Sequence, residues 1–201
     1  MAEDREAPLL LVLHGSGERG EDCRRQLATA GTFLVEPAFQ ASHPCFVVAP
    51  QCPENLNWQS TGSMDVQHAV TEILDELVGT ESVDESRIYL IGYSMGAYGC
   101  WHYLATMPDR FAGCIAVAGG GDPDTAAAVA ETPVWAIHGE NDTVVSPAQS
   151  QRMVDAVVGA GGDARLTLLQ NVDHGSFGVV KQTPNDYLQW LFKQQRSGGG
   201  G

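Results

Sequence analysis

The chain has 201 residues, of which 43% are hydrophobic, and its formal net charge is −14 at pH 7. This length and composition are typical of one globular domain with a sizeable core. The acidic balance argues against nucleic acid as a partner, because affinity for nucleic acid depends on neutralising phosphates. No run of about 18 apolar residues is present, so we expect no transmembrane helix and no membrane insertion.

The two ends of the chain carry little information about the fold. Residues 1–6 are polar and acidic, unlike a signal peptide, and favour a cytoplasmic protein, or a secreted one if a signal peptide was removed. Residues 197–201 read Ser-Gly-Gly-Gly-Gly, which is typical of a linker or an added tail. We therefore expect a single domain over residues 1–196, and the sequence does not indicate its oligomeric state.

Five cysteines occur without a Cys-x-x-Cys pair, so we expect no metal site and no cofactor. Cys100 and Cys114 have apolar neighbours and are predicted to be buried thiols. Cys45 and Cys52 flank one short predicted strand. A disulfide between them is an alternative for an exported protein, although an extended strand of this length usually holds its ends too far apart.

Short apolar runs alternate along the chain with segments of helical periodicity. This order predicts an α/β fold with a mostly parallel central sheet and helices on both faces. The predicted strands cover residues 9–13, 46–49, 88–91, 115–118, 134–137 and 166–169. Helices are predicted over residues 64–78, 95–107 and 185–195, and from Ser146 as N-cap, with Pro147 in the first turn, to Gly159. No insertion is long enough for a large cap domain, so we expect an open site.

Residues 92–96, Gly-Tyr-Ser-Met-Gly, lie between a predicted strand and a predicted helix. Gly-x-Ser-x-Gly in that context is the nucleophile elbow of α/β-hydrolases. The tight turn raises the serine hydroxyl above the sheet at a helix N-terminus, where the peptide dipole favours developing negative charge. Its glycines are needed because side chains there would clash with neighbouring backbone. Ser94 is therefore the predicted nucleophile.

Polar residues follow the fifth and sixth predicted strands, at the edge of the sheet where ligands bind in open α/β folds. Asp142 ends the run 138–142 and His174 follows the sixth strand, which gives the order Ser, Asp, His expected of an α/β-hydrolase. His174 is the predicted base, and Asp142 is the predicted residue that orients it. Asp173, which adjoins the histidine, and Asp122, which also fits a polar loop cap, are the alternatives to Asp142.

The loop of residues 14–17, His-Gly-Ser-Gly, follows the first predicted strand and brings backbone donors to the same edge. We expect the N–H groups of Met95 and Ser16 to form an oxyanion hole for the negative oxygen of a tetrahedral intermediate. The loop lacks the spacing of a nucleotide-binding glycine loop, so we do not expect a nucleotide.

Further residues are expected near the substrate or beneath it. Gly15, Trp58 and Tyr93 are expected to contact the substrate, and a partly buried loop aromatic is the alternative for Trp58. His14 and His138 are predicted to form hydrogen bonds in the turns beneath the site rather than to react.

A resemblance extends over nearly the whole chain up to Arg196. It is carried by residues 13–20 (Leu-His-Gly-Ser-Gly-Glu-Arg-Gly), 49–53 with Trp58, 92–99, 108–112, 138–142 and 173–174. In combination these runs resemble the small carboxylesterase and acyl-thioesterase branch of the α/β-hydrolase superfamily, and most closely the bacterial esterases labelled predicted peptidases. Ser94 argues against dienelactone hydrolase, a relative whose nucleophile is a cysteine.

Together the residues and the resemblance predict a serine carboxylester hydrolase that forms an acyl-enzyme on Ser94. We expect a small-molecule ester with a short-chain or small aromatic acyl group as its substrate. An acyl-thioesterase or a serine peptidase with the same triad is one alternative, and the peptidase is harder because an amine must be protonated to leave. An inactive hydrolase-fold binding module is the other alternative.

Overall fold

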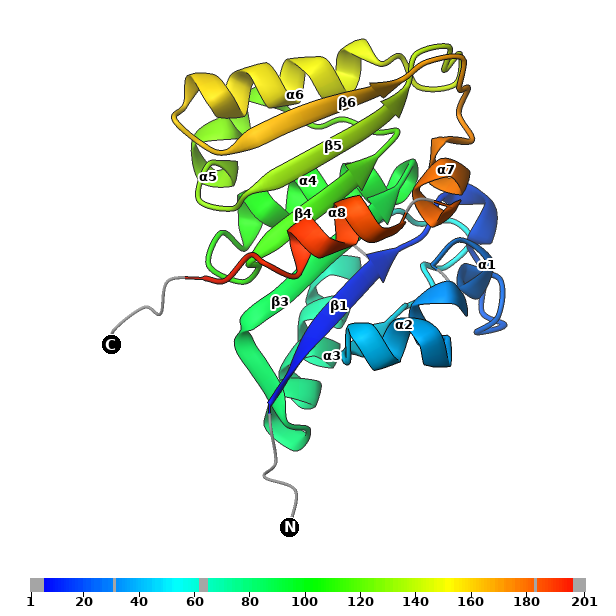
Figure 1. Ribbon diagram of the computed structural model, residues 1–201, viewed down its shortest axis with the longest axis vertical. Coiled ribbons are helices and arrows are strands. Elements are labelled where there is room, and N and C mark those ends of the chain that lie inside the picture. The colour runs from blue at the N-terminus through cyan, green and yellow to red at the C-terminus, as the bar shows by residue number, and fades with distance from the viewer. Residues whose placement is uncertain (1–5, 31, 62–64, 183, 197–201) are drawn as a thin grey trace.

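Six strands form one parallel sheet in the order β2-β1-β3-β4-β5-β6, and helices cover both of its faces (Figure 1). The computed structural model describes residues 6–30, 32–61, 65–182 and 184–196. The strands are β1 (Ala7–Leu13), β2 (Phe46–Val48), β3 (Val83–Tyr93), β4 (Gly113–Val117), β5 (Val134–Gly139) and β6 (Ala164–Leu169). Every neighbouring pair is parallel, which confirms the predicted α/β fold.

The strand order reverses at the centre of the sheet. From β1 the chain moves outward to β2 and then crosses back to β3 on the other side of β1. In open α/β sheets, such a reversal leaves a crevice outside the carboxyl ends of the two central strands. β1 ends at Leu13 and β3 ends at Tyr93, so the loop after β1 and the turn after β3 flank this crevice.

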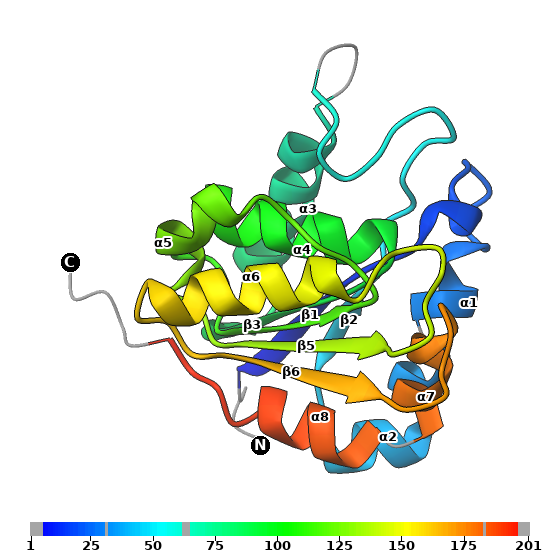
Figure 2. The same cartoon turned by 90° about the horizontal axis from the view of Figure 1, so that it is seen from above.

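Helices lie on both faces of the sheet (Figure 2), and an apolar layer lies beneath each set of helices. Successive side chains of a strand point to opposite faces, so Leu9 and Leu11 join one layer while Leu10 and Val12 join the other. The first layer is covered by α3 (Val66–Thr80), α4 (Met95–Thr106), α5 (Ala126–Val129) and α6 (Ala148–Gly159). The second is covered by α2 (Pro37–Ser42), α7 (Ser176–Gln182) and α8 (Pro184–Leu191). Burial on both faces explains why β1 is a continuous apolar run.

The helix predicted over residues 64–78 is α3, which begins and ends two residues later. Its N-cap is Asp65, whose carboxylate accepts a hydrogen bond from the His68 N–H at 2.9 Å. That bond satisfies one of the free N–H groups at the helix start. Met64, the predicted first residue, lies outside the described residues.

The start of α6 differs from the prediction. The helix begins at Ala148, its N-cap position is Pro147, and no side-chain hydrogen bond caps it. The prediction of Ser146 as N-cap is therefore wrong. Pro147 already has helical angles, φ −55° and ψ −24°, and this pre-formed turn starts the helix without a side-chain acceptor.

Several short helices lie in segments that the sequence analysis left as loops. They are α1 (Gln26–Ala30), α2, α5 and α7, with the 3-10 helices η1 (Ser16–Glu18), η2 (Thr32–Val35) and η3 (Pro123–Thr125). With three to seven residues each, they are too short to show helical periodicity. The helix predicted over residues 185–195 is α8, which begins one residue earlier and ends four residues earlier than predicted.

All five cysteines are free thiols. The disulfide alternative for Cys45 and Cys52 is therefore wrong, and burial raises the pKa of each thiol to about 11. Cys100 and Cys114 are fully buried, as predicted. Among the described residues, no helix is both long and apolar enough to cross a membrane. The predicted tail at residues 197–201 lies outside the described residues.

Candidate active site

The turn between β3 and α4 is strained, and it places Ser94 at the start of a helix. Ser94 has φ 51° and ψ −115°, a conformation that residues with a side chain rarely adopt. Its N–H donates to the Val117 carbonyl at 2.8 Å, which ties the turn to the neighbouring strand β4. A Cβ at Gly92 would lie 2.5 Å from the Cys100 Sγ, and one at Gly96 would collide with the Leu13 carbonyl. Both glycines of the motif are thus required by close packing.

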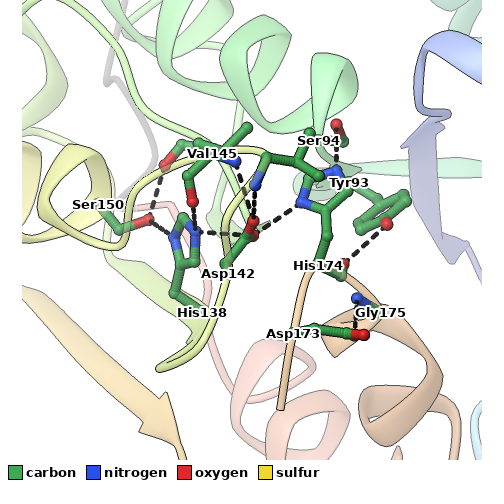
Figure 3. A network of polar contacts seen from close by, with 11 residues as sticks. Tyr93, Ser94, His138, Asp142, Val145, Ser150, Asp173, His174 and Gly175 are labelled. Atoms are coloured by element: carbon green, nitrogen blue, oxygen red, sulfur yellow. Dashed lines mark hydrogen bonds and ion pairs between the residues drawn. The ribbon is translucent and has the colours of Figure 1, made fainter.

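Three side chains from separate loops form one hydrogen-bonded chain (Figure 3). The Ser94 Oγ lies 2.9 Å from the His174 Nε2, and the His174 Nδ1 lies 2.7 Å from the Asp142 Oδ2. The His174 side chain is 21% exposed, whereas that of Asp142 is completely buried. The structure therefore brings together the three residues that the sequence analysis chose as nucleophile, base and orienting carboxylate.

The carboxylate of Asp142 is held in its charged form. Burial by itself would raise its pKa, but the hydrogen bond from His174 and those from the Val145 and Val144 N–H groups outweigh burial and lower the pKa below its ordinary value of 3.8. Both N–H groups lie 2.9 Å from the Asp142 Oδ1. The Oδ2 is thereby left to face His174 as an acceptor.

The two alternative carboxylates point elsewhere. Asp173 is exposed, and its Oδ1 accepts a hydrogen bond from the Gly175 N–H at 2.8 Å, within its own turn (Figure 3). Asp122 caps η3 and accepts from the Asp124 N–H at 3.1 Å. Each carboxylate orients backbone of its own loop, and neither has a hydrogen bond to His174.

The loops after β5 and β6 fit closely together and fix the position of His174. Gly139 ends β5, and a Cβ there would collide with the carbonyls of Val172 and Asp173. The Asn141 N–H donates to the Val172 carbonyl at 2.9 Å. Because only glycine allows this approach, Gly139 lets the histidine loop lie directly beside the aspartate loop.

His14 supports the loop after β1 from beneath, as predicted. Its Nε2 accepts a hydrogen bond from the Cys52 N–H at 2.9 Å, so its Nδ1 carries the proton and donates to the Gly15 carbonyl at 2.6 Å. His14 is fully buried, and burial lowers its pKa below 6.5, which keeps the ring neutral. The Trp58 Nε1 donates to the His14 carbonyl at 2.9 Å and joins a third segment to this loop.

The two N–H groups of the predicted oxyanion hole belong to segments that pack against each other. The close packing of Gly96 against the Leu13 and His14 carbonyls places the loop after β1 beside the start of α4. Within the described part of the chain, neither the Met95 N–H nor the Ser16 N–H has a protein acceptor. Both groups are therefore available to a ligand at this edge of the sheet.

A pocket of about 300 Å³ opens beside the serine. Its lining consists of Arg19, Asn57, Trp58, Gln59, Ser94, Met95 and Tyr98. Trp58 is only 1% exposed, so it forms part of the pocket floor rather than a flexible wall. Gly15 and Tyr93 do not belong to this lining, and the Tyr93 hydroxyl donates to the His174 carbonyl instead, at 2.8 Å.

Four residues of the lining were missed by the sequence analysis: Arg19, Asn57, Gln59 and Tyr98. Arg19 donates from its Nε to the Met95 Sδ at 3.2 Å, and Tyr98 lies one helical turn after Ser94. The spacing of four residues on a helix was a usable signal for Tyr98, because such residues share a face. A larger hollow of about 480 Å³ lies at the opposite end of β1, near Arg87 and Phe192, and none of the predicted site residues lines it.

No group of three or more potential ligand side chains in the described part of the chain is placed to hold a metal ion. Beside Ser94, a serine hydroxyl, a histidine and a buried carboxylate form one hydrogen-bonded chain. Such a set can carry out acyl transfer with protein groups alone.

A sequence profile of the Dienelactone hydrolase family matches residues 22–188, which is most of the chain and includes Ser94, Asp142 and His174. The chain belongs to the dienelactone hydrolase family. This membership confirms the resemblance to the α/β-hydrolase superfamily. That Ser94 argues against dienelactone hydrolase itself stays a prediction, because the profile identifies the family and not the enzyme.

Two curated relatives share part of their sequence with this member of the dienelactone hydrolase family. A bifunctional acetylxylan esterase/xylanase of Neocallimastix patriciarum is 28% identical over 141 residues, which are 70% of this chain and 20% of that protein. A poly(3-hydroxyalkanoate) depolymerase C of Paucimonas lemoignei is 31% identical over 124 residues, 57% of this chain and 28% of that protein. The matches thus span less than a third of either relative.

Solved structures of esterases have the same fold. A thermostable esterase superposes with a TM-score of 0.90 at 34% identity, over 98% of this chain and 57% of that chain. Esterase PE8 superposes with a TM-score of 0.71 at 21% identity, over 93% of this chain and 94% of its own. The similarity to esterase PE8 shows the fold alone. The thermostable esterase is also similar in sequence, over almost all of this dienelactone hydrolase family member.

Proposed function

We propose that this chain is a serine carboxylester hydrolase that works through an acyl-enzyme on Ser94. The observation that carries the proposal is the hydrogen-bonded chain from the Ser94 Oγ through His174 to the buried Asp142, with distances of 2.9 and 2.7 Å. The family and the esterase structures described above support a hydrolase of esters. The serine mechanism and the substrate class are our inference from the geometry.

In the first half-reaction, the Ser94 Oγ attacks the ester carbonyl carbon while its proton passes to the His174 Nε2. The carbonyl oxygen becomes negative and is stabilised by the N–H groups of Met95 and Ser16. When the intermediate collapses, the bond from the carbonyl carbon to the alcohol oxygen breaks. His174 then gives its proton to that oxygen, and the alcohol leaves an acylated Ser94.

In the second half-reaction, water attacks the acyl carbon and passes a proton to His174. Collapse of the second intermediate breaks the bond to the Ser94 Oγ, which takes the proton back as the acid departs. Asp142 remains charged throughout, because its pKa is lowered, and it stabilises the imidazolium form of His174 in both steps.

The small pocket favours a short acyl group. Its volume of about 300 Å³ lies at the lower end of ligand pockets in general. The described helices of eight residues or more, α3, α4, α6 and α8, all pack against strands of the sheet, so they provide no apolar cover for a long chain. Both curated relatives act, by their names, on esters of polymers, and an open site would likewise admit a bulky alcohol group.

The contacts of the substrate follow from the pocket. We propose that Trp58 borders the floor and that Arg19 and Tyr98 form the rim. Gly15 contributes through its backbone beside the oxyanion hole, and Tyr93 acts by supporting the His174 loop beneath the substrate. A thioester would meet the same groups, so an acyl-thioesterase is the second candidate. A peptidase requires better protonation of the leaving amine.

The test is hydrolysis of p-nitrophenyl acetate and butyrate, an acyl thioester and a chromogenic peptide by the purified protein and by Ser94→Ala. We expect ester turnover that falls about 10⁴-fold or more in Ser94→Ala. Ser146→Ala is the matched control, since Ser146 is exposed in a nearby loop. Near-normal turnover by folded Ser94→Ala would remove the serine from the mechanism. No turnover of any substrate by the wild type would favour the inactive binding module.

A further inference from the structure

A second histidine contacts Asp142 from the side opposite His174 (Figure 3). The His138 Nε2 lies 3.1 Å from the Asp142 Oδ2 and 2.9 Å from the Val145 carbonyl. The His138 Nδ1 lies 2.8 Å from the Ser150 Oγ. The aspartate is thus shared between two imidazole rings, of which only that of His174 reaches Ser94.

The partners on the Nε2 side fix a proton on that nitrogen. The Val145 carbonyl can only accept, and so can the ionised carboxylate of Asp142. A bare Nε2 would therefore face two acceptors in a site that is fully buried, since His138 is 0% exposed. Such an arrangement is unfavourable, so the Nε2 must carry hydrogen.

The partners on the Nδ1 side fix a second proton. The Ser150 Oγ lies 2.6 Å from the Gly119 carbonyl, which has no hydrogen to give, so the single hydroxyl proton of Ser150 belongs to that contact. The hydroxyl can then only accept from His138, and the Nδ1 must be the donor. With protons on both nitrogens, the His138 ring is a cation.

We propose that His138 is a positioning residue, held as a buried imidazolium. Its N–H bond fixes the orientation of Asp142, and its charge weakens the attraction of Asp142 for a protonated His174. This inference rests on the proposed function for its catalytic consequence. Asp142 accepts four hydrogen bonds, from His174, His138 and the N–H groups of Val144 and Val145. These bonds occupy the acceptor sites of a carboxylate. The carboxylate therefore has one orientation, and its charge is divided between two rings.

The surroundings of His138 contain few other charges. From α6 the neutral Ser150 contacts the ring, and the hydroxyl of Ser150 is in turn bonded to the Gly119 carbonyl in the loop after β4. The loop after β5 supplies Asp142, the charged group in direct contact with the ring. The neighbouring residue on β6 is Leu168, which does not titrate. The imidazolium thus acts on the site through Asp142, and through it on His174.

A consequence for catalysis follows from the shared charge. A cation beside Asp142 weakens the attraction of the carboxylate for a protonated His174. His174 can then lose its proton, and serve as a base, at a lower pH than it would with Asp142 alone. A neutral residue at position 138 should reverse this effect and shift the acid limb of kcat/KM to higher pH.

The protonation state is tested without any activity measurement. We would record nitrogen NMR spectra of the ¹⁵N-histidine-labelled wild type at about pH 7 and assign the His138 signals by their absence from His138→Gln. The expected result is that both ring nitrogens of His138 have the chemical shift of protonated nitrogen. One unprotonated nitrogen would overturn the inference, while the proposed ester hydrolysis would stand.

The positioning role is tested by the pH profile of kcat/KM for p-nitrophenyl acetate. His138→Gln retains an amide donor but removes the charge. We expect its acid limb to move up by about one pH unit, so that activity at about pH 6 falls roughly tenfold more than at about pH 8. Ser150→Ala removes the acceptor of the Nδ1 proton and should move the acid limb in the same direction. It provides the test if His138→Gln does not fold.

Ser176→Ala is the matched control, because Ser176 is equally buried near His174 but its Oγ has no hydrogen-bond partner. Its acid limb should remain that of the wild type. An unmoved or lowered limb in both His138→Gln and Ser150→Ala would overturn the positioning role. Absence of ester hydrolysis by the wild type would instead refute the proposed function, and the NMR result would still decide the charge of His138.

Discussion

The Tyr93 hydroxyl donates a hydrogen bond to the backbone carbonyl of His174 across 2.8 Å. The two rings also lie in contact, with centroids 5.3 Å apart. Tyr93 directly precedes Ser94, so this bond joins the strand that ends at the serine to the loop that carries the histidine. The distance between nucleophile and base thus depends on a residue that reacts with neither.

The first prediction concerns this support. Tyr93→Phe keeps the ring but loses the hydroxyl, and a hydrogen bond of this kind contributes about 0.5–1.5 kcal/mol. We expect kcat to fall about threefold to tenfold with little change in KM, because the histidine is less well held. Steady-state kinetics with p-nitrophenyl acetate measures this.

Tyr89→Phe provides the control for stability. The Tyr89 hydroxyl, four residues before Tyr93 on β3, donates to the Gln194 carbonyl at 2.8 Å and has no contact with His174. Its loss should lower the free energy of unfolding by a similar amount and leave kcat unchanged. Equal losses of kcat in both variants would show that Tyr93 contributes general stability rather than support of His174.

The second prediction separates the three carboxylates. Asp142→Asn should lower kcat/KM by about 10³- to 10⁴-fold, since an amide favours the wrong tautomer of His174. Asp173→Asn and Asp122→Asn should each cost less than about tenfold, because their side chains bond to their own loops. The most damaging change among the three, measured under identical conditions, identifies the orienting acid. A larger loss in Asp173→Asn would make our assignment wrong.

The third prediction concerns pH. A neutral histidine base is required, so kcat/KM should rise with pH across the range in which histidine side chains ordinarily lose their proton. Asp142 does not produce this limb, because its lowered pKa keeps it ionised well below that range. EDTA should not change the profile. Inhibition by EDTA that a divalent ion reverses would contradict the metal-free mechanism.

The lowered pKa of Asp142 also affects stability. A carboxyl group whose pKa is lower in the folded state stabilises the fold above its ordinary pKa of 3.8, and this stabilisation is lost as pH falls through the folded value. Asp142→Asn should therefore show a weaker loss of stability between about pH 5 and pH 2 than the wild type. Urea unfolding at several pH values measures the difference, and identical pH dependence would exclude this contribution.

The fourth prediction uses the strain at the nucleophile. Ser94 has φ 51°, and such a conformation costs about 1–3 kcal/mol for a residue with a side chain. Ser94→Gly and Ser94→Ala should both be inactive. Glycine relieves the strain but makes the unfolded chain more flexible, so Ser94→Gly should have the higher free energy of unfolding by a net of about 1 kcal/mol. Ser42, at a helical position, is the control: the Ser42→Gly protein should be less stable than the Ser42→Ala protein.

The fifth prediction concerns the acyl chain. Full burial of a methylene contributes about 0.8 kcal/mol, but a pocket of about 300 Å³ cannot bury a long chain. We expect kcat/KM to be highest for acyl groups of about two to six carbons and to show no activation at an oil–water interface. A series of p-nitrophenyl esters checks this. A steady rise to about C12 or C16 would point to a long groove beside Trp58.

The sequence alone predicted the six strands, the parallel sheet and the turn that carries Ser94. These features depend on local patterns, since apolar runs, helical periodicity and the two glycines of the elbow act over a few neighbouring residues. The order of Ser94, Asp142 and His174 along the chain was also informative, because the carboxyl ends of parallel strands meet at one edge. Even the supporting role of His14 could be inferred from its place after β1.

The tertiary structure decided what depends on packing between distant loops. Asp142 and Asp173 were both candidates in the sequence, and only the close approach of the two loops at Gly139 shows which carboxylate faces His174. The charge proposed for His138 depends on its contacts with Ser150 on α6 and with the Val145 carbonyl, and on the bond from Ser150 to the Gly119 carbonyl in the loop after β4. Hydrogen-bond partners of this kind leave no periodic pattern in a sequence. They are fixed by the packing of helices on the sheet, so they emerge only when the chain is folded.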